Sequence, residues 1–157
     1  MPQRQDWSRS VCPIARSMDV LGDAWALRIL GEAMVGVRRY DDFRRRLGIA
    51  DNVLSRRLGQ LVDEGVLARA PYRGPRRTQY EYVLTDAGKE LFPILSAMAL
   101  WGERHTRAPG PTGHLRVVHT ACGTPSSGAE ACSHCGTPLT KDNSHWERLW
   151  ETAAAAP

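Results

Sequence analysis

The stretch from residue 40 to residue 84 changes its pattern of apolar positions partway along. Its first half repeats apolar residues at spacings of three and four, which is typical of amphipathic helices. This spacing predicts helices over residues 41–47 and 52–64, with a turn at Gly48 and a left-handed C-cap at Gly65. The residues on the apolar faces are Phe43, Leu47, Leu54, Leu58, Leu61 and Val62.

Two strand-like runs follow, at residues 66–70 and 78–84. The loop between them, residues 73–77, is rich in Arg, Gly and Pro. Helix, turn, helix and β-hairpin in this order are the plan of a winged helix-turn-helix, whose second helix enters the DNA major groove. The loop would be the tip of the wing, which can lie along the phosphate backbone or enter a minor groove.

Polar side chains occupy the face of the second predicted helix opposite its apolar stripe. An Arg can bond a guanine through two hydrogen bonds, and short polar side chains also suit hydrogen bonding to base edges. The first helix and the wing tip add arginines that would hold the phosphate backbone. The candidate DNA contacts are Arg44, Asn52, Ser55, Arg56, Arg57, Gln60, Arg73, Arg76 and Arg77.

Positive charge is concentrated in the same stretch. Residues 36–84 hold 11 Arg against six acidic residues, whereas the whole chain has a net charge of +4. The chain also has 19 Arg and only two Lys, which indicates a compositional bias, and Arg-rich faces are often no more than solvated helix surfaces. Charge therefore supports a DNA partner only in combination with the ordered motif.

Helices are also predicted on both sides of this motif. Cys12 is expected as the N-cap of a helix that starts at Pro13, and Asp23 as the N-cap of an apolar helix over residues 24–34. After the wing, Thr85 would cap one continuous helix that reaches about His105. Its apolar stripe is longer than one winged domain needs, which favours a dimerisation helix; the alternative is a helix that closes the monomer core.

Length and composition limit the class of protein. At 157 residues and 42% hydrophobic content, one domain with a small appendage is expected. No signal-peptide pattern and no apolar run of about 20 residues is visible, which predicts a cytoplasmic protein. We predict a mainly α fold with a small β-hairpin (α+β). A winged domain over residues 12–106 would be joined through a Pro- and Gly-rich linker, 107–113, to a zinc-ribbon-like module, 114–150.

The cysteines of the predicted module point to metal chemistry. An HxxC sequence followed by Gly stands at residues 119–123, and a CxxC followed by Gly stands at residues 132–136. Together they can supply a tetrahedral Cys₃His zinc site formed by His119, Cys122, Cys132 and Cys135. His134 and His145 are alternatives for the fourth ligand. A degenerate ribbon without metal and a CxxC redox pair remain open, although no βαβ pattern supports the redox pair.

Several blocks of sequence, taken together, resemble one family. CPIARSMDVLGDAWALRIL, RRYDDFRRRLGIADNVLSRRLGQLVDEGVLAR, YEYVLTDAGKEL and ALWGERH occur in order over residues 12–105. They closely resemble the HxlR-type transcriptional regulators, bacterial winged-helix proteins related to the MarR group. The resemblance implies a homodimer on a palindromic operator, with the terminal helices in the dimer interface. Where the family usually has a Ser cap on the recognition helix, this chain has Ala50, so Asp51 is expected to cap instead.

The resemblance also draws attention to Cys12, because some members sense oxidants or electrophiles through a Cys at this position. The dipole of the helix that starts at Pro13, with Arg9 and Arg16 nearby, would favour the reactive thiolate. The alternative is a buried, unreactive cysteine.

These patterns fit three classes of function unequally. The leading hypothesis is a dimeric DNA-binding transcriptional regulator, acting as a repressor. The alternative is a zinc-ribbon module for protein or RNA interaction, carried on a winged-helix domain. An enzyme is not expected, because the chain has no P-loop, GxSxG or HExxH motif.

Overall fold

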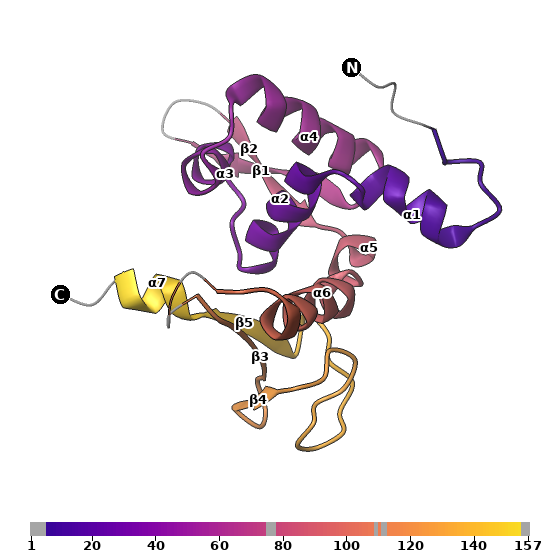
Figure 1. Ribbon diagram of the computed structural model, residues 1–157. Helices are drawn as coiled ribbons and strands as arrows, with labels where there is room; N and C mark the ends of the chain where they lie inside the picture. The colour runs from indigo at the N-terminus through magenta and orange to yellow at the C-terminus, as the bar shows by residue number, and fades with distance from the viewer. Residues whose placement is uncertain (1–5, 75–77, 109, 111–112, 155–157) are drawn as a thin grey trace. The chain divides into compact units, whose positions relative to one another are not determined.

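A computed structural model describes residues 6–74, 78–108, 110 and 113–154. The chain forms two compact units, Met1–Thr85 and Asp86–Pro157 (Figure 1). Within the described residues, no helix combines the length and the apolar character that crossing a bilayer requires. The mainly α fold with small antiparallel sheets confirms the predicted fold class.

The first unit is a bundle of short helices followed by a β-hairpin. Its elements are α1 (Pro13–Leu21), α2 (Ala24–Met34), α3 (Tyr40–Leu47), α4 (Asp51–Asp63), β1 (Leu67–Arg73) and β2 (Thr78–Leu84). The apolar stripes of α2, α3 and α4 meet in a core in which Ile29, Phe43 and Leu54 are fully buried. Each such side chain contributes roughly 1.5–3 kcal/mol relative to exposure to water.

The helix caps in this unit agree with those predicted from the sequence, with one exception. Asp23 caps α2 as predicted, since its carboxylate accepts hydrogen bonds from the amides of Trp25 (3.0 Å) and Ala26 (3.2 Å). Gly48 and Gly65 adopt the left-handed conformations that the turn and the C-cap require. The predicted Asp51 cap is wrong: Ala50 is the N-cap and makes no side-chain bond.

The hairpin is longer than predicted. Its strands pair from Leu67 with Leu84 to Arg73 with Thr78, although Pro71 lies inside β1. In a two-stranded sheet every strand has an open edge, so a residue without an N–H group can be tolerated there.

The second unit is a helix packed on a small sheet. It comprises α5 (Asp86–Lys89), α6 (Phe92–His105), β3 (Leu115–His119), β4 (Thr124–Ser126), β5 (Ser144–Arg148) and α7 (Leu149–Ala154). The strands form an antiparallel sheet in the order β4-β3-β5.

The expected continuous helix from Thr85 to His105 is wrong, because the chain breaks between Lys89 and Phe92. Pro93 explains the break: it has no amide hydrogen and its ring would collide with the carbonyl group of Lys89. The sequence pattern places α6 with the winged domain, but α6 packs with the sheet in the second unit. The predicted boundaries of the DNA-binding and dimerisation domain (residues 12–106) and of the zinc-ribbon-like module (residues 114–150) stay predictions.

Candidate DNA-binding face and metal centre

Helix α4 separates its apolar and polar residues as a recognition helix must. Leu54, Leu58 and Leu61 are buried in the core of the first unit. Asn52, Ser55 and Arg56 are exposed on the other side. The structure therefore presents three of the predicted DNA contacts together, on one face of one helix.

Arg57 and Gln60 are engaged inside the protein. The Arg57 guanidinium pairs with the Asp23 carboxylate at 2.6 Å and donates to the Gln60 side-chain oxygen at 3.0 Å. Its side chain is only 16% exposed. Because Asp23 also caps α2, Arg57 ties α4 to the start of α2.

Arg56 differs from its neighbour in both exposure and pairing. Its side chain is exposed, and among the residues that the structure describes it has no ion-pair partner. Its guanidinium is thus available to an external acceptor.

A polar network joins α3 to the start of α4. The Tyr40 hydroxyl donates to the Asp51 carbonyl oxygen (2.9 Å) and lies 3.0 Å from the Ser55 hydroxyl. The Arg44 guanidinium lies 3.3 Å from both carboxylate oxygens of Asp51. This network holds two candidate contacts, Arg44 and Ser55, in place. The role of Tyr40 has no signal in the sequence, because it depends on the packing of α3 against α4.

The base of the wing is basic and aromatic. Arg73 is exposed at the end of β1, and the Arg39 guanidinium lies 4.7 Å from the ring centre of Tyr72 on the same strand. Arg76 and Arg77 lie outside the described residues, so their predicted contacts stay predictions.

The second unit brings the four predicted metal ligands together. The ligand atoms of His119, Cys122, Cys132 and Cys135 all lie within 4.8 Å of one another. His119 and Cys132 are buried, Cys122 is half-buried and Cys135 is exposed. His134 and His145, the alternative ligands, are exposed and do not belong to this cluster. The arrangement is compatible with a metal site.

The two halves of the cluster have the same backbone turn. The Gly123 amide donates to the His119 carbonyl and the Gly136 amide donates to the Cys132 carbonyl, both at 2.8 Å. Both glycines are left-handed, with φ of 64° and 73°. The HxxCG and CxxCG sequences therefore form paired knuckles, as their spacing predicts.

The thiols of the knuckles differ in acidity. Hydrogen bonds with the side chain and the backbone of Thr137, together with one to Cys122, lower the pKa of Cys135 to about 6. The hydrogen bond with Cys135 and desolvation raise the pKa of Cys122 to about 11. A cluster of three sulfur ligands and one imidazole suits a soft divalent cation.

Ser126 positions the second knuckle and was not identified from the sequence. Its buried hydroxyl accepts from the Ser133 amide (3.1 Å) and lies 3.3 Å from the Ala131 carbonyl oxygen. These two groups flank Cys132. Ser126 is a common residue type six residues before Cys132, and no spacing rule reveals this role.

Cys12 is the N-cap residue of α1, as predicted, and its side chain makes no capping bond. It is exposed, which contradicts the alternative of a buried cysteine within the single chain. The neighbouring Arg16 guanidinium donates to the carbonyls of Ser10 (2.7 Å) and Val11 (3.0 Å), where it stiffens the turn before the helix.

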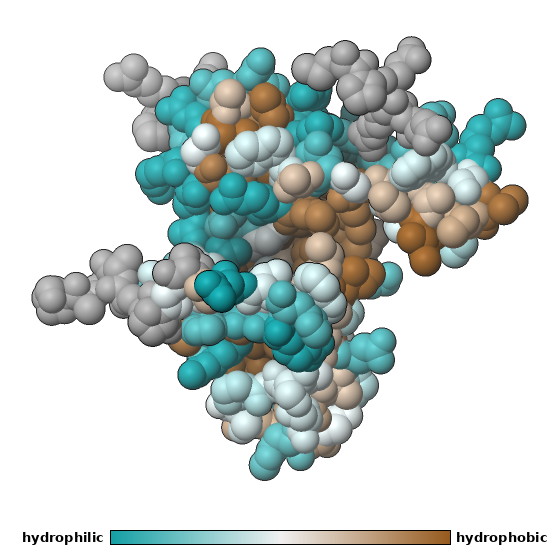
Figure 2. Space-filling model, viewed as in Figure 1, coloured by the Kyte–Doolittle hydropathy of each residue, from teal (hydrophilic) through white to brown (hydrophobic). Residues whose placement is uncertain are grey.

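Each unit exposes apolar side chains on one helix. Hydrophobic side chains gather over α1 in the first unit (Figure 2), where none of the helix residues is buried. Val11, Ile14 and Met18 are exposed there, and Ile94, Met98 and Trp101 are about half exposed on α6. Large contiguous apolar patches are rare on monomeric proteins, so both faces are candidate interfaces.

The three-dimensional arrangement defines the class of protein. A helix-turn-helix whose second helix exposes a polar face, followed by a β-hairpin with basic residues, is a winged helix-turn-helix DNA-binding domain. The model of the HxlR-like helix-turn-helix family matches residues 20–109, and the chain belongs to this family. The protein is a DNA-binding transcriptional regulator of the HxlR type.

Relatives are similar over much of the chain. Rv3095 of Mycobacterium tuberculosis (strain ATCC 25618 / H37Rv), named an uncharacterized HTH-type transcriptional regulator, is 39% identical over 132 residues, which cover 83% of this chain and 81% of that protein. The crystal structure of PA1607, a candidate transcription factor, is 38% identical with a TM-score of 0.69; the match covers 84% of this chain and 91% of that one. The redox regulator HypR in its reduced form is 31% identical with a TM-score of 0.54, over 59% of this chain and 92% of HypR.

The lengths of these matches distinguish two groups of relatives. A 132-residue match cannot fit within the 113 residues that precede His114, so the similarity to Rv3095 extends into the cysteine-containing module. HypR is almost fully covered by little more than half of this chain. The match to Rv3095 thus covers a larger share of this chain than the match to HypR does.

Proposed function

We propose that the protein binds an operator as a homodimer and represses transcription. In each subunit α4 enters the major groove, Arg56 contacts base edges, and Asn52 and Ser55 support it. Arg44, Arg73, Arg76 and Arg77 contact the phosphate backbone. The observation that carries this proposal is the exposed face of α4, on which the Arg56 guanidinium is exposed and available to an external acceptor.

Binding to DNA selected from a random duplex pool tests this proposal. The pool should converge on one sequence, and the affinity should fall steeply with salt because phosphate contacts release counterions. Equal affinity for selected and random duplexes would contradict a sequence-specific regulator.

The exposed apolar side chains of α1 and α6 support the homodimer. A second copy would remove Ile14 and Met18 of α1, or Met98 and Trp101 of α6, from water, which stabilises association by roughly 25 cal/mol per Å² of apolar surface. The family resemblance also implies that terminal helices form the dimer interface.

We propose zinc as the metal of the Cys₃His cluster. Three sulfurs and one imidazole at mutual distances below 4.8 Å fit tetrahedral coordination. Four protein ligands leave no open position, so the role is structural rather than catalytic.

Cys12 is proposed as a thiol sensor, supported by its exposure at a helix N-terminus and by the similarity to HypR, which is named a redox regulator. We expect diamide or a quinone to release wild-type protein from its operator, whereas Cys12→Ser should stay bound, because modification at α1 would disturb the dimer. Fluorescence anisotropy of labelled operator measures the release. Equal release of the two proteins would assign sensing elsewhere.

A further inference from the structure

Helix α6 carries two different faces. Phe92, Leu95 and Ser96 on one face are buried. Ile94, Met98 and Trp101 lie on the other side and are about half exposed. The helix that we propose as a dimer contact therefore has one face buried within its own chain and the opposite face open to a partner.

The support comes from the sheet of the cysteine-containing module. Trp146 of β5 stacks on Phe92, with ring centres 5.5 Å apart and an interplanar angle of 22°. The indole N–H of Trp146 donates to the Ser96 hydroxyl at 2.9 Å. Because Ser96 is fully buried, this bond satisfies a polar group that would otherwise be costly to bury.

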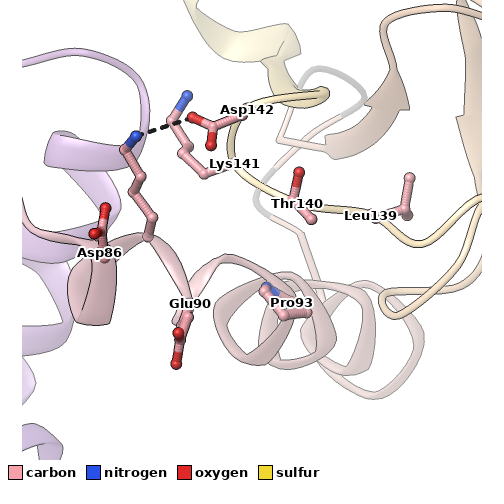
Figure 3. Close-up of a pocket in the computed structure, with 8 residues that line it drawn as sticks. Asp86, Glu90, Pro93, Leu139, Thr140, Lys141 and Asp142 are labelled. Atoms are coloured by element: carbon pink, nitrogen blue, oxygen red, sulfur yellow. Dashed lines mark ion pairs between the residues drawn. The ribbon is translucent and has the colours of Figure 1, made fainter.

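Two polar contacts extend the support along the helices. Near the end of α6, the Glu103 carboxylate accepts from the Leu115 amide and bonds the His114 ring, both at 2.7 Å. At the other end, the Lys89 ammonium group pairs with Asp142 at 3.1 Å, beside a pocket lined by Pro93 and Leu139 (Figure 3).

The same sheet leads directly to the metal cluster. His119 is the last residue of β3 and pairs with Ser144 of β5. Two residues before His119 on β3, Val117 pairs with Trp146, which lies two residues after Ser144 on the antiparallel strand β5. The metal ligand His119 and Trp146 are therefore two residue pairs apart in the ladder that joins β3 and β5.

The module has little apolar core of its own to hold that sheet. Among its described residues, the buried apolar side chains are Val117, Val118, Cys132 and Leu139. A core this small does not offset the entropy of ordering about 40 residues, so metal binding would supply the missing folding energy. Cys135 is exposed, which gives a bound ion a route to exchange with the solution.

We propose that metal occupancy of the Cys₃His cluster controls operator affinity, with Trp146 as the positioning residue that couples the cluster to α6. When the cluster holds metal, the sheet keeps α6 in the conformation that dimerises. Without metal, α6 loses the support of the sheet and the dimer weakens. This inference rests on the proposed function, since it requires both the metal site and the α6 interface.

The test uses full-length, zinc-loaded protein and measures dimerisation by analytical ultracentrifugation and operator affinity by anisotropy. Stripping zinc with a chelator should weaken both by roughly 5–150-fold, the usual range of coupling between two sites. Trp146→Ala should retain one zinc per chain by elemental analysis but lose most of this response. Glu147→Ala, an exposed neighbour on β5, should respond like the wild type.

Ser96→Ala provides a milder second variant, because it removes the hydrogen bond and leaves the aromatic stack. If Trp146→Ala loses its zinc, Ser96→Ala decides: a zinc response as large as that of Glu147→Ala would overturn the coupling through Trp146. Unchanged operator affinity of the stripped wild-type protein would overturn the whole inference. Failure of the zinc-loaded protein to select any DNA would instead refute the proposed function.

Discussion

Cys132→Ser is expected to abolish metal binding and to unfold the module over residues 114–150. Cys132 is a buried member of the cluster, and a serine hydroxyl is a poor replacement for thiolate as a zinc ligand. In small zinc domains the metal contributes about 10–16 kcal/mol, and this binding energy is also folding energy. Elemental analysis should find one zinc per wild-type chain and none in the variant, while near-ultraviolet circular dichroism should lose the signal of the packed Trp146.

The matched control is His134→Ala, which changes an exposed residue inside the same CxxC loop. It should keep one zinc per chain and the folded module. A Cys132→Ser protein that retained stoichiometric zinc would exclude this ligand set. If wild-type protein never contained metal and all three thiols of the cluster were freely titratable, the remaining interpretation would be a ribbon that folds without metal.

Arg56→Ala is expected to relax the base preference of the protein at one position of each half-site. The loss should be about 1–3 kcal/mol for the preferred sequence and much smaller for sequences that already differ there. Alanine favours a helix, so α4 should stay intact. Competition between the selected operator and its single-base variants measures the effect.

Two arginine variants separate base contact from charge and from stability. Arg116→Ala removes the same charge from an exposed position on β3 and should leave base preference unchanged. Arg57→Ala should lower the melting temperature, because it breaks the 2.6 Å pair with the Asp23 cap. Unaltered preference in Arg56→Ala would show that another residue contacts the bases.

Local spacing was enough to predict the helix-turn-helix, the hairpin and the residues of the Cys₃His cluster, which the structure brings together. The stripe from Leu54 to Leu61 repeats within a few residues, and each knuckle is contained in five residues with its own glycine. Patterns of this kind involve residues close together in the sequence, so they can be recognised without knowledge of the tertiary structure.

The remaining features depend on contacts between residues far apart in the chain. Arg57 and Arg56 look alike in the sequence, and only the approach of Asp23, 34 residues away, separates their roles. Ser96 likewise meets Trp146 across 50 residues. The break before α6 is a different case, because Pro93 is visible in the sequence and indicates a helix break. The apolar stripe around it led instead to the prediction of one continuous helix.

Footprinting of the full-length protein on its selected DNA tests the central claim most directly. Two α4 helices in successive major grooves should protect an inverted repeat whose half-site centres lie about 34 Å, or one helical turn, apart. Two chains should bind each duplex. Protection of a single half-site by one chain, or uniform protection without a preferred sequence, would contradict the account.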